Sequence, residues 1–384
     1  MSRIEKLTEY VKTIRDGIST KKDYQEYSSL IDNVTPIDAF EIFSSLLNEG
    51  DSEGEILQYL DKVINVFYHR LEKYEVDESE HEFLNNLLLE NKILREIMNK
   101  IKAIIKSPSL DKEKDLLLDE IVKLKEFSKH YIIIENILFP YMEKKEDRFQ
   151  GTSIMWALHN KVEESLKEVI KAIDSNNENK INKYLGEIFF GYLGLAQKEE
   201  LILFPSALEI FDKNDWKKMQ YQSLEYEWAF INIDKKYLSE IDENKAYFSD
   251  KLFNSETGHL SAEQIFLMLN TLNVDLTFVD QNDKVKFFTK PKDRIFPRSP
   301  AIIGREVKNC HPPESVQIVE KILESFKNGS KDNAKFWINM KGKTILIQYF
   351  ALRDQLGDYI GTLEITQDVT SIKSLKGEKR LLDW

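Results

Sequence analysis

The chain has 384 residues, of which 42% are hydrophobic and 31% are charged, and its formal net charge is −12 at pH 7. This length exceeds one typical hydrophobic core and predicts two or three domains. The negative charge argues against binding to nucleic acid or to an anionic membrane surface. The single cysteine, Cys310, excludes an intramolecular disulfide and fits a reducing compartment, so we expect a cytoplasmic protein. No apolar run approaches the roughly 20 residues that span a bilayer, so we expect no membrane segment.

Residues 1–245 show an almost wholly helical pattern. Apolar residues recur every three or four positions, as in IDAFEIFSSLLNEG and EILQYLDKVINVFYHRL. Helix breaks are expected around Gly50 and Gly54 and within KSPSLDKEKD at 106–115.

Two stretches of this helical half repeat one another: ENILFP at 135–140 and ELILFP at 200–205. A repeated helical hairpin is typical of a four-helix bundle. A helix end stopped by proline would explain the Leu, Phe and Pro of the repeat. It would not explain a glutamate inside an apolar stretch, where a charge must find a partner.

HYIIIENILFPYMEK followed by SIMWALHNKVEESLK resembles the second half of the hemerythrin-like, cation-binding (HHE) domains. This resemblance implies an all-α four-helix bundle over 76–245. Residues 1–75 resemble a helical domain of unknown function that commonly precedes such bundles. The family sets five histidines and two carboxylates around a non-haem di-iron centre, ligands that suit iron.

Carried over by position, the resemblance implies these metal ligands: His130, Glu135, His159, Glu200 and Glu90.

Three of the five expected histidines are missing, because their positions hold Leu195, Asn85 and a residue near Val63. His69 and His81 lie nearby but out of register, and each residue turns a helix by about 100°.

Residues five apart on a helix, such as His130 and Glu135, differ by about 140°. The remaining set could hold one metal, bind weakly, or form a metal-free polar core in which glutamates pair with histidines or with lysines such as Lys198.

The pattern changes near residue 255, after a polar boundary at 246–260. LTFVD and KVKFFT alternate apolar and polar residues across a QND turn, and AKFWINM, KTILIQYFALRD and YIGTLEIT follow the same period. A helix over 314–327 begins with Pro and ends at Gly. Strands, short helices and then three strands predict an α+β domain built on an antiparallel sheet.

The stretch that begins LSAEQIFLMLNTLNVDLTFVD is similar to PAS domains over 255–375. The ending TLEITQDVTSIKSL resembles the last PAS strand and its exit into an output helix. The resemblance implies a five-stranded antiparallel sheet around a pocket that binds haem, flavin or a small metabolite, or that only packs against a partner.

Residues that alternate inward from these strands and helices are the candidate pocket: Phe278, Phe288, Ile303, Cys310, His311, Val316, Val319, Phe336, Ile347 and Tyr349. The alternative is that the apolar members simply form the core.

Cys310 and His311 are residue types that serve as axial haem ligands. Alternatively, Cys310 packs as a small apolar residue and His311 hydrogen-bonds its loop.

The sequence contains no glycine-rich phosphate loop, GxSxG elbow or Cys-x-x-Cys pair, so we expect no enzyme. We expect a sensory, signal-transduction protein whose PAS domain binds a small-molecule or redox ligand, haem or a partner protein. Its output would be a contact with a protein partner. The helix at 262–272 could also pair two copies of the chain into a homodimer. The alternative is a non-haem iron protein that binds dioxygen or nitric oxide, and an oxidoreductase using that metal is third.

Overall fold

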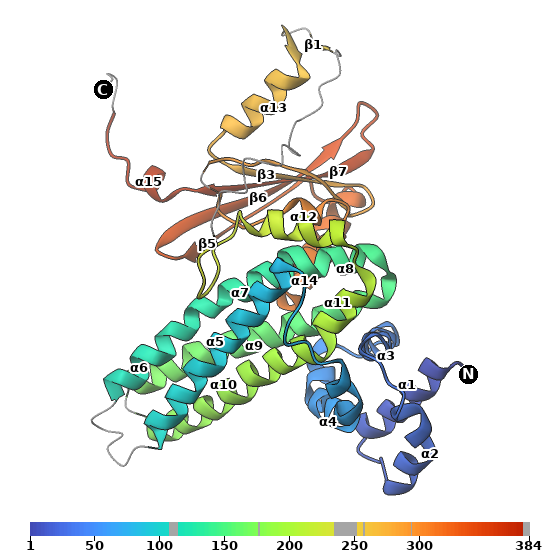
Figure 1. The fold of residues 1–384 in the computed structure, drawn as a ribbon. Helices are drawn as coiled ribbons and strands as arrows, with labels where there is room; N and C mark the ends of the chain where they lie inside the picture. The colour runs from blue at the N-terminus through green and yellow to red at the C-terminus, as the bar shows by residue number, and fades with distance from the viewer. Residues whose placement is uncertain (107–113, 176, 234–251, 256–257, 293, 379–384) are drawn as a thin grey trace. The chain divides into compact units, whose positions relative to one another are not determined.

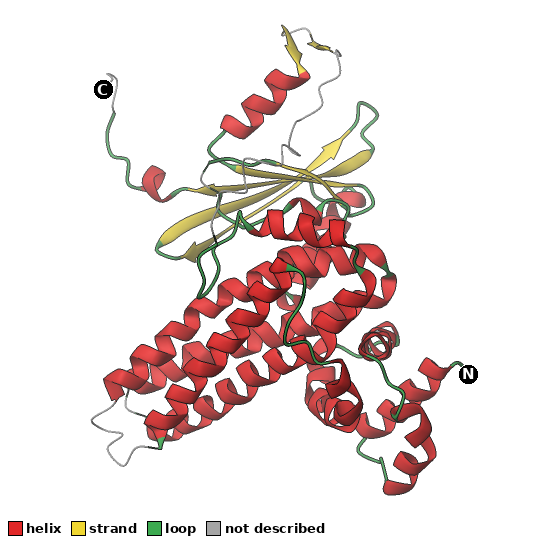
Figure 2. Ribbon diagram, in the orientation of Figure 1, coloured by secondary structure: helices red, strands yellow, loops and turns green. Residues whose placement is uncertain are grey.

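The computed structural model describes residues 1–378 except 107–113, 176, 234–251, 256–257 and 293. The chain divides into two compact units, Met1–Leu238 and Ser239–Trp384 (Figure 1). The described part of the first unit is helical, whereas the second is built on a β-sheet (Figure 2). Within the ranges given above, no helix is both long enough and apolar enough to cross a membrane.

The first unit begins with α1 (Arg3–Arg15), α2 (Lys21–Ile31), α3 (Pro36–Asn48), α4 (Glu53–Leu71) and the 3-10 helix η1 (Glu72–Tyr74).

Capping boxes start all four of these α-helices. In each box a Ser or Thr side chain accepts from the backbone N–H three residues on, and the acidic side chain there accepts in return. The pairs are Ser2/Glu5, Thr20/Asp23, Thr35/Asp38 and Ser52/Glu55. The break predicted near Gly50 is confirmed, whereas Gly54 lies in the first turn of α4.

The chain then forms a bundle from α5 (Glu82–Ile105), α6 (Lys114–Lys123), η3 (Leu124–Phe127), α7 (Ser128–Ile133), η4 (Ile134–Leu138), α8 (Phe139–Lys145), η5 (Asp147–Gly151), α9 (Thr152–Asp174), α10 (Glu178–Lys198), η6 (Glu199–Leu203), α11 (Phe204–Ile210) and α12 (Lys213–Ser223). Most of the break predicted at 106–115 lies outside the described residues.

The two ENILFP-like repeats share an unusual local structure. Each forms a π-helix, η4 or η6, that continues directly into an α-helix with Pro140 or Pro205 at its start. Proline is tolerated there because its missing N–H is not required in a first helical turn. The alternative in which proline ends the helix is therefore wrong. π-Helical turns are rare and occur frequently at functional sites.

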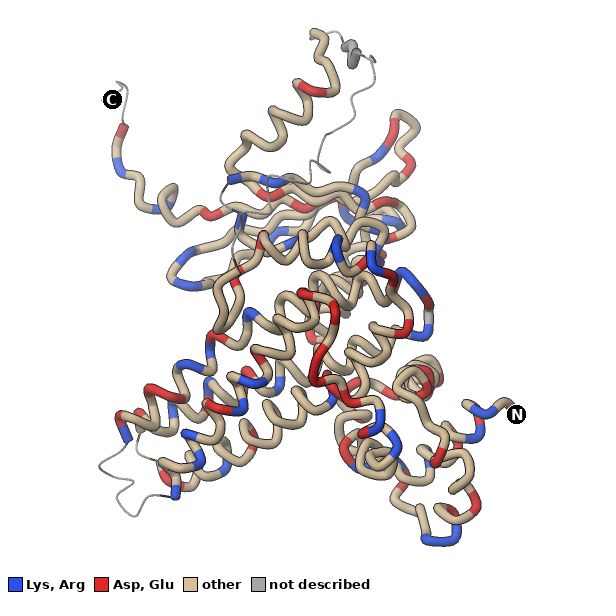
Figure 3. The backbone as a smooth tube through the Cα atoms, in the orientation of Figure 1, with Lys and Arg blue, Asp and Glu red and all other residues tan. Residues whose placement is uncertain are grey.

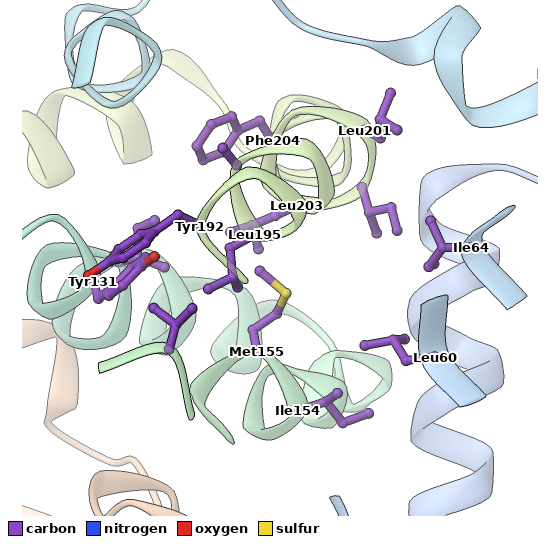
Figure 4. Close-up of a cluster of buried hydrophobic side chains, with 14 of the residues drawn as sticks. Leu60, Ile64, Tyr131, Ile154, Met155, Tyr192, Leu195, Leu201, Leu203 and Phe204 are labelled. Atoms are coloured by element: carbon purple, nitrogen blue, oxygen red, sulfur yellow. The ribbon is translucent and has the colours of Figure 1, made fainter. Parts of the chain in front are cut away.

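One hydrophobic core runs through the first unit, from Leu7 of α1 to Trp228 after α12. Figure 4 shows part of it, where Leu60 and Ile64 of α4 lie near Ile154 of α9. The proposed division into 1–75 and 76–245 stays a prediction, since both segments contribute to the same core. Along the helices, acidic and basic residues are interspersed (Figure 3).

The second unit contains a five-stranded sheet of β3 (Asp275–Asp280), β4 (Val285–Phe288), β5 (Asn333–Met340), β6 (Lys343–Arg353) and β7 (Tyr359–Asp368). The strand order is β4-β3-β7-β6-β5 and all neighbours are antiparallel, which confirms the predicted sheet.

The remaining elements are β1 (Leu252–Ser255), β2 (Gly258–Ser261), α13 (Ala262–Thr271), η8 (Pro300–Ile302), η9 (Val307–Cys310), α14 (Pro313–Lys327) and α15 (Thr370–Lys373).

Helix α14 covers one side of the sheet, which we call the inner face. Val319 and Leu323 of α14 pack in one cluster with Val279 of β3, and Phe326 packs with Ile345 of β6. The inner face is therefore the side where a PAS-like pocket would lie.

Candidate functional site

A buried histidine in the bundle lies between two glutamates. Nδ1 of His130 on α7 is 3.0 Å from Oε2 of Glu90 on α5, and Nε2 is 3.2 Å from Oε2 of Glu199 on η6. All three side chains are fully buried. Burial alone would lower the pKa of His130, but the carboxylates of Glu199 and Glu90 outweigh it and raise this pKa to about 9. His130 is therefore a cation at neutral pH.

The two glutamates have further partners. Oε1 of Glu90 accepts from the backbone N–H of Phe230 at 2.9 Å, and Oε2 of Glu199 accepts from Nδ2 of Asn91 at 2.9 Å. The other oxygen of Glu199 is buried with no hydrogen-bond partner in the described part of the chain. The network thus spans α5, α7 and η6 but leaves one carboxylate oxygen unsatisfied.

A second buried pair joins α9 to η4. Nδ1 of His159 is 2.7 Å from Oε1 of Glu135, and the Tyr131 ring stacks on the imidazole with centroids 4.0 Å apart. Burial lowers the pKa of His159 to about 3, so its imidazole is neutral at physiological pH. A neutral ring with a proton on Nδ1 donates to Glu135, while Nε2 is buried without a partner among the residues described.

Glu200 lies apart from both histidine pairs. Its two carboxylate oxygens accept from Arg95, Oε1 from Nη1 at 2.7 Å and Oε2 from Nη2 at 2.5 Å. The acidic residue that contacts His130 is instead Glu199, which the sequence comparison of the two repeats missed. The π-helix changes the angular register of the segment, so the repeat does not reveal which glutamate points inward. The sequence did show that either glutamate could face the bundle interior, because KEELILF has two adjacent glutamates before an apolar run.

At the three positions where the family has its other histidines, this chain has residues that play structural roles. Val63 and Leu195 are buried in the hydrophobic core, where Figure 4 shows Leu195 among apolar side chains. The amide of Asn85 hydrogen-bonds the backbone N–H and C=O of Ser79. The lysine predicted as a glutamate partner, Lys198, pairs with Asp61 on α4 at 2.7 Å.

The second unit contains a buried ion pair on its inner face. Nη2 of Arg298 donates to both oxygens of Glu364 on β7, at 3.1 and 3.0 Å, and Thr366 adds a hydrogen bond at 3.2 Å. Burial alone would raise the pKa of Glu364, but Arg298 and His311 outweigh it and lower this pKa. The buried side of β7 is therefore polar, with Thr362 beside Glu364 and Thr366.

Sequence reasoning missed Arg298 and Glu364. The apolar alternation of TLEIT predicts that Leu363 and Ile365 face inward, so a glutamate within a strand was the only available signal.

The predicted pocket residues differ in how deeply they are buried. Phe288, Val319, Ile347 and Tyr349 are buried, and Phe278, Cys310, His311 and Val316 are half-buried. Ile303 and Phe336 are each 37% exposed, so these two are not enclosed. The Phe336 ring still lies 6.0 Å from that of Tyr349 across the β5–β6 pair.

Two family models match separate parts of the chain. A model described as the hemerythrin HHE cation binding domain matches residues 82–207, and one described as a PAS domain matches residues 265–370. The chain carries an HHE domain followed by a PAS domain. Both predicted resemblances are confirmed, while the assignment of 1–75 stays a prediction.

Several solved structures are similar to part of this chain. A C-terminal domain from Streptococcus mutans has 34% identity, covering 33% of this chain and 98% of that one, with a TM-score of 0.32. The PAS domain of a protein from Colwellia psychrerythraea has 16% identity, 28% and 97% coverage, and a TM-score of 0.24. A sensory box sensor histidine kinase from Vibrio cholerae has 12% identity, 28% and 89% coverage, and a TM-score of 0.23. No curated protein matches the chain.

The donor set of the HHE domain does not fit a di-iron centre. His130 uses both ring nitrogens on carboxylates, and His159 uses one on Glu135. Across the described ranges, no group of three or more His, Cys, Asp or Glu side chains is arranged to hold a metal ion.

In the PAS domain, the two candidate haem ligands differ in surroundings. Burial lowers the pKa of His311, which keeps its imidazole in the neutral form that can bind a metal. Sγ of Cys310 is 3.6 Å from the backbone oxygen of Glu306, a weak hydrogen bond. Both the haem assignment and the packing alternative stay predictions.

Proposed function

We propose that this chain is a sensory, signal-transduction protein whose PAS domain binds a small polar ligand. The observation that carries the proposal is the buried pair of Arg298 and Glu364 on the inner face of the sheet. A buried ion pair is often no more stabilising than well-packed hydrophobic residues of the same volume. Its presence where a PAS pocket lies therefore favours a role in recognising polar groups.

The polar character extends beyond this pair. Thr277 of β3 is the cross-strand neighbour of Glu364, and its hydroxyl is buried with no partner within the described chain. Tyr349 of β6 is the neighbour of Glu364 on the other side. A donor-rich inner face of this kind matches small-molecule sites, which combine apolar walls with a few placed polar groups.

In this proposal the HHE bundle has a structural role. The protein is cytoplasmic, and it passes its signal on through contact with another protein. A single cysteine and a net charge of −12 support the location and a partner that is not nucleic acid. The iron-binding alternative lacks a supporting donor set.

A thermal-shift screen of the full chain against small polar metabolites tests the proposal, with an absorption spectrum to detect bound haem. A ligand at 100 times its Kd stabilises the state it binds by about 2.7 kcal/mol, which raises the unfolding midpoint.

Thr277→Val is the matched variant, because it removes an unpaired hydroxyl while keeping the side-chain shape. We expect it to leave the ligand-free midpoint unchanged or higher and to reduce the ligand-induced shift. No bound haem and no shift with any ligand in the wild-type chain would refute the proposal.

A further inference from the structure

A polar cavity of about 380 Å³ opens at one end of the PAS sheet. Its wall comes from the segment that leads into β3, from the loop after β4, and from the start of β6 and the end of β7. Charged residues of both signs line it: Asp275, Arg294, Lys343 and Asp368. Its mixed charge favours a ligand that itself carries both signs.

Asp275 contributes a buried carboxylate oxygen that lacks a hydrogen-bond donor, although its other oxygen, Oδ2, lies 4.0 Å from Nε of Arg294. Asp275 is 3% exposed, and its Oδ2 accepts from the backbone N–H groups of Ile295 and Phe296 at 3.0 and 3.3 Å. Its Oδ1 is buried and has no hydrogen-bond partner in the described chain. A buried carboxylate oxygen without a donor is costly, and a ligand N–H group would satisfy it.

Arg298 contributes a positively charged N–H group that has no hydrogen-bond acceptor among the described residues. Its Nη2 is held by Glu364, but its Nη1 is buried with no partner among the described residues. Glu364 is the cross-strand neighbour of Thr277, two residues from Asp275 on β3. Asp275 and Thr277 lie on the same face of β3, so the glutamate that binds Arg298 is one cross-strand pair away from Asp275. Oδ1 of Asp275 and Nη1 of Arg298 thus carry opposite charge, and neither has a hydrogen-bond partner among the described residues.

We propose that this end of the PAS domain binds a small zwitterion of the free amino acid class, with its ammonium group on Asp275 and its carboxylate on Arg298. The inference rests on the proposed sensory function and names its ligand. Asp275 lines the cavity, whereas Arg298 lies behind its wall, so the ligand carboxylate reaches Arg298 through a local opening of that wall. The ligand side chain occupies the cavity beside the ion pair of Lys343 and Asp368.

The same cavity touches the exit of the domain. Asp368 accepts from the backbone N–H of Thr370 at 3.0 Å, at the start of α15, and pairs with Lys343 at 3.2 Å. Ser371 of α15 also lines the cavity. A bound amino acid therefore contacts the segment before β3 and the exit helix together, which couples occupancy to the position of α15.

Isothermal titration calorimetry of the full chain with the twenty protein amino acids tests this inference. For each amino acid that binds, the N-acetyl derivative removes the ammonium charge and the amide removes the carboxylate. Each loss removes a hydrogen bond to a charged group, so we expect each derivative to bind at least about tenfold more weakly. A derivative that binds as tightly as its parent would overturn the inference.

Two variants test the named atoms. Asp275→Asn retains an oxygen for Ile295 and Phe296 but turns the free acceptor into a donor, and Arg298→Lys keeps Glu364 paired but removes Nη1. Each is expected to weaken amino acid binding by at least about tenfold. Asp358→Asn, an exposed aspartate in the same domain, is the control and should bind as wild type.

The outcomes separate this inference from the proposed function. Binding of only non-zwitterionic metabolites keeps the sensory proposal and overturns the ligand class. Amino acid binding that survives both variants overturns the site. No binding of any small molecule overturns both.

Discussion

At the residue scale, the bundle interior depends on which side chain pairs with each histidine. Glu199 and Glu200 are adjacent in sequence, but one contacts His130 and the other Arg95. The charge states of His130 and His159 differ because the first has two carboxylates against its ring and the second is dominated by burial.

The substitutions Glu199→Gln and Glu200→Gln should therefore have different effects on His130. Removing the charge of Glu199 removes the largest influence that raises the pKa of His130, so we expect that pKa to fall by at least about 1 unit. Glu200→Gln should leave it nearly unchanged. Titration of the imidazole proton signals by NMR measures both, and equal effects of the two variants would contradict the assigned pairing.

The two histidines also predict opposite dependences of stability on pH. The pKa of His130 is about 9 in the folded chain, above its ordinary value, so its contribution is complete below pH ~6.5 and is lost as the pH rises through 9. The pKa of His159 is about 3, so its contribution is present above pH ~6.5 and is lost as the pH falls toward 3.

Urea unfolding at several pH values measures this dependence. From pH 7 to pH 9 the free energy of unfolding should fall by about 2 kcal/mol through His130. His130→Gln is the control and should show a flatter profile in this window. If the free energy of unfolding of the variant fell just as steeply between pH 7 and pH 9, groups other than His130 would cause the loss of stability.

At the scale of elements, α9 and α10 pack closely at one glycine. A Cβ at Gly191 of α10 would lie 1.9 Å from Cγ2 of Val162 on α9, whereas a Cβ at Gly186 of the same helix would meet nothing within 4 Å. Gly191 is therefore required by packing, and Gly186 is not.

Gly191→Ala should destabilise the bundle by about 1–3 kcal/mol because Val162 must move. Gly186→Ala should stabilise it by about 0.5–1 kcal/mol, since alanine has the higher helix propensity. Urea unfolding followed by helical circular dichroism measures both. Similar changes in the two variants would contradict this packing of α9 on α10.

The elements themselves were largely predictable. The alternation of KTILIQYFALRD and the turn before it predict β6, because strand period and turn residues are local properties. The polar inner side of β7 was not predictable in this way. Thr362, Glu364 and Thr366 are buried while Leu363 and Ile365 are only half-buried, since Arg298 supplies the partner that the strand sequence does not contain.

At the scale of the whole molecule, the HHE fold persists without the family's full set of metal ligands. Hydrophobic residues at positions such as Val63 and Leu195 add to the core where imidazoles are expected. The fold is held by this packing and by the buried ion pairs.

Anaerobic reconstitution with Fe(II), followed by desalting and metal analysis, should accordingly give well below one iron per chain. The unfolding midpoint should also be the same with and without a chelator, because only a bound metal would stabilise the folded state. Two irons per chain would show that the donor set rearranges on binding.

The sequence by itself determined the two folds and their order, because helical and strand periods, caps and turns act over a few residues. The resemblance to the HHE family predicted His130, His159, Glu135 and Glu90 as site residues, and the apolar stretch around Glu135 predicted that this glutamate needs a partner. Only the tertiary structure decided that Glu199 faces His130 and that Arg298 holds Glu364. Each buried charge takes its partner from another element, 69 residues away for His130 and 66 for Arg298, and a π-helix sets the register that a repeat cannot reveal.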